Sequence, residues 1–207
     1  MSTYDKLLLS VEYNNKEIYQ LNIENNLKML KRRDLINSVE DEYKKLEKDI
    51  GNKMIYSLVL NNNTSCGIYF LNIKITTIVA NSPIDEYLTN NVEINKIIIA
   101  KEVTKKVIKQ ITTEYKNTEF FFEYEMLEDL PNKVYIPEHK LLNNAEKEEL
   151  LSKFTEYELS RIIVTDIMSR YYGAKIGDIF RICRPSFTAG KNIFYRKVVN
   201  GSLDILF

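Results

Sequence analysis

The most constraining feature of this sequence is a segment at residues 161–196, in which glycines and a proline separate short apolar runs. Asp166 stands where an N-cap would begin a short helix, and Gly173 stands where the left-handed conformation that ends a helix is easiest to reach. Strand-like runs flank this helix, with RIIV before it and IFRIC and IFYRKVV after it. The segment therefore predicts a small mixed domain with short strands, in which residues 184–190 form the loop between the last two strands.

The same segment resembles the C-terminal core of a family of small RNA polymerase subunits, numbered five in eukaryotes and called H in archaea. The matching elements, in order, are RI at 161–162, Asp166, RYYGAKIGD at 170–178, RPS at 184–186, TAG at 188–190 and YR at 195–196. Upstream, IPEH at 136–139 and EKEELLSKF at 146–154 correspond to a short PxH element and an acidic helix of the family. Ser160 and Ile167 stand where the family usually has prolines, a loss of local stiffness that costs about 0.5–1 kcal/mol each.

The resemblance implies an α+β or α/β chain with two domains. A jaw-like N-terminal domain, residues 1–124, would have a mixed sheet covered by helices, and a small mixed α/β assembly domain would follow at residues 125–207. The implied role is that of a non-catalytic subunit of a multisubunit DNA-directed RNA polymerase. The second domain would pack on the largest subunit and on other polymerase subunits, and the first would belong to the jaw around downstream duplex DNA.

The elements that carry the resemblance are also the candidate interface with the polymerase. Arginines offer planar, bidentate donors suited to interface carboxylates, and the glycines and the proline give the last loop a fixed path with exposed amides. Equally, each residue could simply shape the fold. The candidates are Arg170, Tyr171, Tyr172, Gly173, Arg184, Pro185, Ser186, Thr188, Ala189 and Gly190.

The first half of the sequence has the pattern of helices packed on a sheet. Ile23, Leu27 and Leu30 recur at helical spacing before the basic run at 31–33, which we interpret as a solvated helix end. Ser38 and Asp41 have capping spacing and predict a second helix that closes near Gly51. Strands are expected at 54–60, 67–71, 97–100 and 120–124, the first two antiparallel and the third buried on both faces.

A further helix is expected to begin near Thr104, with Val107, Ile108 and Ile111 on its inward face. Lys105, Lys106 and Lys109 would then point away from the core. These lysines could follow a phosphate backbone of downstream DNA, although such a trio is more often a solvated face. In the second half, Asn143 and Glu146 have the spacing of a capping pair and predict an acidic helix.

The charge distribution limits the alternatives. The formal net charge is zero, which disfavours a free DNA-binding transcription factor, because phosphate neutralisation dominates such affinity. Residues 159–207 nevertheless carry eight basic and three acidic side chains, which could form a docking face or merely alternate into solvent. A metal-dependent nuclease is a further alternative, but its clearest ExK motif, at 42–44, is predicted on a helix and not at a strand end.

Metal, cofactor, small-molecule and membrane roles find little support in the residue types. Cys66 and Cys183 are far apart, no CxxC spacing occurs and His139 is the single histidine, so a structural zinc site is not expected. His139 is expected to pack or to form a hydrogen bond. No apolar run reaches the length of a membrane span, and no cofactor or small-molecule ligand is expected.

Composition points to the source more than to the function. The abundance of Asn, Ile, Lys and Tyr is what AT-rich coding DNA produces. Together with the resemblance, it favours a large DNA virus with its own transcription apparatus. The expected location is the nucleus or the cytoplasm and, for a virus, the cytoplasmic replication site and the virion. Residues 200–207 extend past the usual end of the family pattern, and the sequence gives no account of them.

Overall fold

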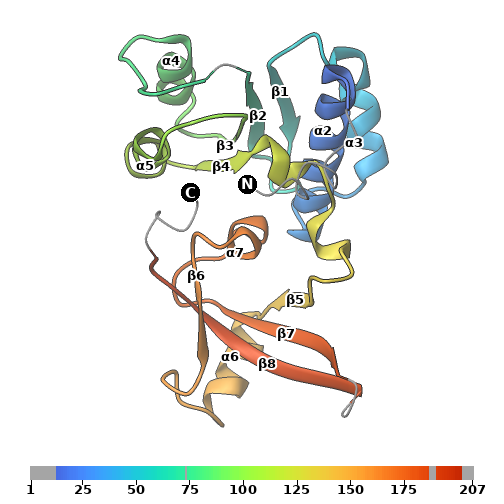
Figure 1. Ribbon diagram of the computed structural model, residues 1–207, viewed down its shortest axis with the longest axis vertical. Coiled ribbons are helices and arrows are strands. Elements are labelled where there is room, and N and C mark those ends of the chain that lie inside the picture. Colours follow the sequence, from blue (N-terminus) through green and yellow to red (C-terminus); the bar gives the residue numbers. More distant parts are fainter. Residues whose placement is uncertain (1–12, 73, 187–189, 202–207) are drawn as a thin grey trace, which may run out of the picture.

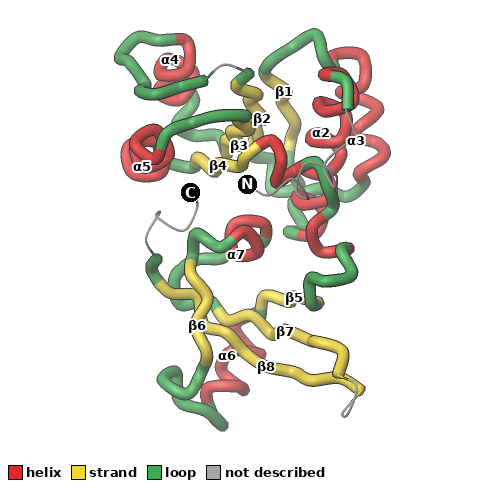
Figure 2. Tube along the Cα trace, in the orientation of Figure 1, coloured by secondary structure: helices red, strands yellow, loops and turns green. Residues whose placement is uncertain are grey.

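Two four-stranded sheets form the frame of the protein, one above the other in Figure 1. The computed structural model describes residues 13–72, 74–186 and 190–201. The part that contains the first sheet and its helices, up to β4, is called the first unit below, and the part that contains the second sheet is called the second unit. Figure 2 shows that most helical segments belong to the first unit, as expected for an α+β chain.

The first sheet has the strand order β1-β2-β3-β4. Its strands are β1 (Ile55–Val59), β2 (Ser65–Leu71), β3 (Asn95–Ala100) and β4 (Thr118–Phe122). The predicted antiparallel pairing of β1 with β2 is confirmed, whereas β2, β3 and β4 run parallel. Parallel neighbours need a crossover, and α4 (Pro83–Asn90) and α5 (Lys105–Glu114) supply the two that are required.

Helices cover both faces of this sheet. On one face lie α2 (Asn15–Arg32) and α3 (Val39–Leu46), which continues into the 3-10 turn Glu47–Asp49, and on the other face lie α4 and α5. Successive side chains of a strand point to opposite faces, so Ile97 and Ile99 join the α2 core while Ile98 joins the core under α5. The prediction that β3 is buried on both faces is confirmed.

The predicted helix starts are confirmed by their hydrogen bonds. The Ser38 hydroxyl accepts from the amide of Asp41 at 3.2 Å. Asn143 and Glu146 form a reciprocal capping box at the start of α6 (Asn144–Leu151). Helix α5 begins directly after Thr104, although that side chain makes no capping hydrogen bond.

The second sheet has the order β5-β7-β8-β6, and α7 (Ile167–Tyr171) lies between it and the first unit (Figure 1). Its strands are β5 (Glu138–Leu141), β6 (Ser160–Ile163), β7 (Ile179–Ser186) and β8 (Gly190–Val199). The side chains of Met168 and Tyr171 join the core cluster that α2 forms with the first sheet. The domain boundary expected after residue 124 lies within the 3-10 turn Glu123–Met126, and a second such turn follows at Leu130–Asn132.

The prediction that residues 184–190 form a loop is wrong for residues 184–186 and for Gly190, which belong to strands. Strand β7 continues to Ser186 and β8 starts at Gly190, and these two residues pair with each other. Pro185 is tolerated because β5 stops pairing with β7 at Cys183, so Pro185 lies on an edge where a missing N–H leaves no ladder bond unmade. Thr188 and Ala189 lie outside the described residues.

Other differences are smaller. The strand expected at 120–124 ends at Phe122 and turns into the 3-10 segment, and neither α4 nor β5 was expected. Within the described ranges, no helix is long and apolar enough to cross a membrane.

Candidate assembly surface and the junction behind it

Arg33, the C-cap residue of α2, joins α2 to both β4 and α7. Its guanidinium makes a two-pronged ion pair with Glu119, with both N···O distances 2.8 Å. The same group donates to the main-chain carbonyls of Tyr171 at 2.9 Å and Arg170 at 2.6 Å. Only 9% of its side chain is exposed, so the interpretation of the basic run as a solvated helix end is wrong for Arg33.

Arg170 makes the reverse connection, from α7 into the first unit. Its guanidinium pairs with both carboxylate oxygens of Glu125 and donates to the carbonyl of Phe120 at 3.0 Å. Its Nε donates to the carbonyl of Thr165 at 3.1 Å. The side chains of Arg170 and Glu125 are 15% and 10% exposed. The structure therefore uses the donors of this candidate interface residue within the chain.

Tyr171 completes the contact between the units. Its side chain is 1% exposed, and its hydroxyl accepts a 2.5 Å hydrogen bond from Arg32. Arg32 also forms a two-pronged pair with Asp129, at 2.5 and 2.9 Å. Burial raises the pKa of the Tyr171 phenol, so the phenol stays protonated at neutral pH. We refer to Arg32, Arg33, Arg170, Tyr171 and their three carboxylates as the junction.

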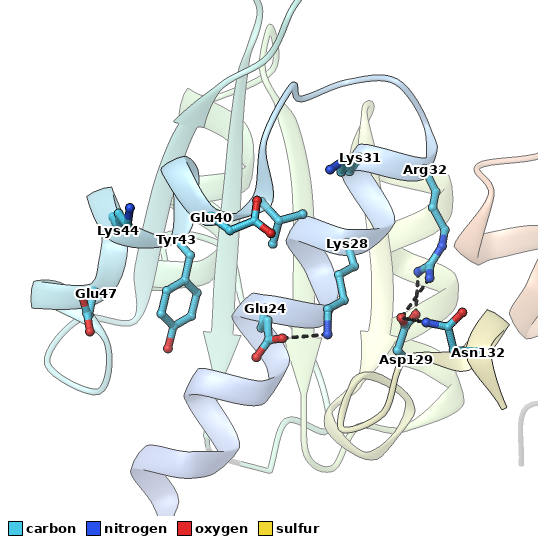
Figure 3. A pocket seen from close by; sticks show the side chains of 11 residues that line it. Glu24, Lys28, Lys31, Arg32, Glu40, Tyr43, Lys44, Glu47, Asp129 and Asn132 are labelled. Atoms are coloured by element: carbon cyan, nitrogen blue, oxygen red, sulfur yellow. Dashed lines mark hydrogen bonds and ion pairs between the residues drawn. The ribbon is translucent and has the colours of Figure 1, made fainter.

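An open groove of about 850 Å³ lies beside the junction, between α2 and α3 (Figure 3). Figure 3 shows Arg32 and Asp129 at one end of it, with Asn132 donating to Asp129 at 2.7 Å, and the Lys28–Glu24 ion pair along α2. Its charged residues balance, with four basic and four acidic: Lys28, Lys31, Arg32, Lys44, Glu24, Glu40, Glu47 and Asp129. A groove without a dominant charge does not select a charged ligand, and no sequence pattern had indicated it.

Gly173 and Tyr172 shape the end of α7. Gly173 has φ of 63°, and a Cβ there would lie 3.3 Å from the guanidinium carbon of Arg33, so both backbone and space favour glycine. Tyr172 is half-buried and meets the edge of Phe180 with ring centroids 5.8 Å apart. These two candidates lie against the junction and the second core.

The β7–β8 hairpin presents the remaining candidates differently. Arg184, Pro185 and Gly190 are exposed, and Ser186 is half-buried. The guanidinium carbon of Arg184 lies 5.4 Å from the centre of the Phe194 ring, and that of Arg196 lies 5.6 Å from it. This hairpin end, defined as Arg184, Pro185, Ser186, Gly190 and the neighbouring Phe194, combines one cation with apolar surface and is the candidate assembly surface.

The lysine trio lies on the outer side of α5. Lys105, Lys106 and Lys109 are exposed, whereas Val107, Ile108 and Ile111 are buried, as the helical spacing predicted. The trio and the hairpin end belong to different units of the molecule. The structure does not bring them together into one site.

The two features considered for catalysis, His139 and the Glu42–Lys44 motif, lie in a packed hydrogen-bonded position and on a helix. The Nδ1 of His139 lies 2.7 Å from the Pro137 carbonyl, the ring meets the edge of Phe180, and burial lowers the pKa of the imidazole. The Glu42–Lys44 motif lies on α3, as predicted. In the ranges that the structure describes, no cluster of three or more His, Cys, Asp or Glu side chains is placed to hold a metal ion.

Comparisons with known proteins agree on one group of relatives. The family described as "RNA polymerase Rpb5, C-terminal domain" matches residues 129–198. DNA-directed RNA polymerase subunit 5 of Acanthamoeba polyphaga mimivirus is 37% identical over 128 residues, which is 61% of this chain and 62% of the relative. A Dictyostelium discoideum protein, DNA-directed RNA polymerases I, II, and III subunit rpabc1, is 38% identical over 109 residues, 50% of this chain and 55% of the relative.

A shorter archaeal relative is covered almost completely. DNA-directed RNA polymerase subunit Rpo5 of Archaeoglobus fulgidus is 40% identical over 72 residues, which is 34% of this chain but 95% of the relative. In contrast, the matched part of this chain spans 62% and 55% of the length of the viral and Dictyostelium relatives.

Proposed function

Because this chain belongs to the RNA polymerase subunit 5 family, we propose that it is a non-catalytic subunit of a multisubunit DNA-directed RNA polymerase. The observation that carries the proposal is the match to almost the whole length of an archaeal polymerase subunit, at 40% identity. The roles found for His139 and for the Glu42–Lys44 motif are in accord with a chain that supports catalysis elsewhere in the complex.

We propose that the second unit docks on the largest polymerase subunit through the hairpin end. Arg184, Pro185 and Gly190 are exposed there, whereas Arg170 and Tyr171 are already bound within the chain. The excess of basic side chains in residues 159–207 favours an acidic partner surface. A guanidinium held near an aromatic ring can bind an interface carboxylate with less loss of side-chain entropy than a free arginine.

In the same assembly, the first unit would contribute to the jaw around downstream duplex DNA. The lysine trio on α5 supports a weak, salt-sensitive contact, since exposed lysines near a phosphate backbone displace condensed counterions. The proposal gives DNA no larger role, because the chain as a whole carries no net charge.

The relative from a giant virus supports a viral source. The proposed site of action is then the place of viral transcription in the cytoplasm, with packaging in the virion, whereas a cellular polymerase would place the chain in the nucleus.

Affinity purification of the tagged chain at moderate salt, from the cells or virions that make it, tests the proposal. We expect the two large catalytic polymerase subunits in amounts matched to the tagged chain, measured by quantitative mass spectrometry. A tagged unrelated protein of similar size and zero net charge provides the background. Recovery of the chain without polymerase subunits would refute the assembly role and direct attention to free DNA binding.

A further inference from the structure

Strand β8 extends well beyond β6, the strand that pairs with its side facing away from β7 (Figure 1). Strand β6 pairs with β8 only from Arg196 to Val199, whereas β7 pairs with β8 from Gly190 to Lys197. Among the described residues, no strand pairs with residues 190–195 on the side that faces away from β7. We refer to that side of residues 191–195 as the free edge.

The main-chain groups of β8 alternate between its two sides, and its C-terminal end shows which residue faces which side. The Val198 amide donates to the Asp178 carbonyl at 2.7 Å, and the Val198 carbonyl accepts from the Gly177 amide at 2.9 Å, both just before β7. The Val199 carbonyl instead accepts from the amide of Val164, next to β6, at 2.9 Å. Even-numbered residues of β8 therefore face β7, and odd-numbered residues face the other side.

The free edge consequently offers the main chain of Lys191 and Ile193 to a partner. The register between β7 and β8 is unbroken over residues 190–197, so the alternation holds along that stretch. Each of the two residues presents one amide donor and one carbonyl acceptor, and both residues are exposed. Such a row of unpaired groups is a template on which another strand can pair.

The other edge of the hairpin is closed to the same kind of pairing. Beyond Cys183, where β5 ends its pairing, the next residue of β7 that faces outward is Pro185, which stands opposite Lys191. Proline has no N–H, and its presence on an edge strand hinders the addition of a further strand. Residues 191–195, KNIFY, contain no proline. The sequence therefore blocks one edge of the hairpin and leaves the other open.

The side chains along the free edge indicate what kind of strand it fits. Lys191 and Ile193 are two residues apart, so their side chains share one face of the sheet, and 44% of the Ile193 side chain is exposed. Around the second sheet, ion pairs are formed by Lys140, Lys153 and Lys197, so Lys191 has no carboxylate partner among the described residues. A matching strand has an apolar residue beside Ile193 and an acidic residue beside Lys191.

We propose that the free edge of β8 binds an extended, acidic segment of another polymerase subunit as an added strand of the second sheet. This inference rests on the proposed function and adds to it how the partner is held. Main-chain hydrogen bonds to Lys191 and Ile193 supply affinity, and the alternating side chains of the segment supply specificity. The free edge is continuous with the hairpin end, because Phe194 belongs to both. The partner therefore meets one uninterrupted surface.

Amide hydrogen exchange at single-residue resolution tests the pairing. In the isolated chain, we expect the amides of Lys191 and Ile193 to exchange nearly as fast as in an unstructured peptide, and those of Asn192 and Phe194 to be protected by β7. In the assembled polymerase, the first two should exchange at least about tenfold more slowly, because they have gained hydrogen-bond partners. Normal assembly with continued fast exchange of both amides would overturn the added strand and leave the polymerase role intact.

Proline substitution tests whether the main chain or the side chain binds. Because Ile193 faces away from β7, Ile193→Pro removes an outward N–H without removing a hydrogen bond between β7 and β8. Its incorporation into the polymerase should be at least about tenfold lower than that of Ile193→Ala, which keeps the amide. Equal incorporation of the two variants would show that only the side chain matters and would overturn the proposal. Urea unfolding of each isolated variant establishes that it folds.

Lys191→Pro provides a second variant if Ile193→Pro fails to fold. Position 191 already stands opposite a proline, so the hairpin tolerates that residue at this pair, and Lys191→Ala is the control that keeps the amide. Protection of the free edge that increases with the concentration of the isolated chain would overturn the proposal and identify a second copy as the occupant. Failure of the unaltered chain to assemble would refute the polymerase role and this inference with it.

Discussion

Arg170 and Arg184 come from the same stretch of sequence and were candidates for the same interface, yet the structure uses them in opposite ways. Arg170 is largely buried, and its guanidinium is bound by Glu125 and by carbonyls of Phe120 and Thr165. Arg184 is exposed and lies over the Phe194 ring. The comparison shows that the same segment of sequence places one arginine in the contact between the two units and leaves the other exposed at the hairpin end.

The two cysteines offer a second comparison between a buried side chain and a half-buried one. Their difference in reactivity is the largest effect that we expect. Burial raises the pKa of Cys66 to about 12, from 9.0 for an ordinary thiol, which lowers its thiolate fraction about a thousandfold at neutral pH. Cys183 lies half-buried on β7. We expect a thiol reagent to label Cys183 rapidly and Cys66 only on unfolding.

Labelling kinetics of the native chain measure this difference, and Cys183→Ser should remove the fast phase alone. Two fast thiols would show that the first sheet opens readily. Assembly with the polymerase should slow the fast phase, because the proposed interface covers the hairpin.

Replacing Arg170 by Ala should give the next largest effect. The change leaves Glu125 buried without its partner, and the loss of one member of a buried pair costs about 3 kcal/mol or more, roughly a hundredfold in the folding equilibrium. Urea unfolding provides the measurement. Arg161→Ala is the matched control, since Arg161 is an exposed arginine of the same unit. A loss below about 1 kcal/mol would show that the junction does not hold the units together.

Arg184→Glu should leave folding nearly unchanged, within about 1 kcal/mol, and should reduce incorporation into the polymerase at least about tenfold. The reason is that an acidic side chain at the hairpin end repels the acidic surface proposed for the partner. Competition with the unaltered chain during reconstitution gives the ratio, and Arg161→Glu controls for net charge. If Arg184→Glu unfolds the isolated chain, the side chain belongs to the core and the comparison fails.

Reversing Lys105, Lys106 and Lys109 to Glu should have the smallest effect. Assembly should be intact, whereas transcription at elevated salt should fall a few-fold, because counterion-releasing contacts to DNA are lost. Reversal of the exposed Lys44, Lys45 and Lys48, on the opposite face of the first sheet, is the matched control. Equal activity of the two triple variants would return the trio to the role of a solvated face.

Local features of the fold were predictable because both partners of each interaction lie close together in sequence. Ser38 and Asp41 are three residues apart, as are Asn143 and Glu146, so a capping bond can be inferred before any tertiary contact is known. The continuous apolar run in β3 likewise indicates a strand covered on both faces.

The junction could not be predicted, for the corresponding reason. Glu119 is 86 residues from Arg33, and nothing in the basic run distinguishes an arginine bound to a distant carboxylate from one that faces water. The path of the β7–β8 hairpin was predicted wrongly for a different reason. Pro185 indicates a turn when read alone, and its place in a strand depends on β5 ending its pairing at Cys183.

The contact between Arg33 and the end of α7 also constrains the order in which the protein folds. Helix α7 has only five residues, far below the roughly 12–15 that an isolated helix needs for marginal stability in water. The carbonyls of Arg170 and Tyr171 accept hydrogen bonds from Arg33, which lies 137 and 138 residues earlier in the sequence. Contacts of such long range form late, after the entropy of closing the intervening chain has been overcome. Arg33 is therefore synthesised well before the carbonyl groups to which it donates. Helix α7 is expected to be among the last elements to become stable.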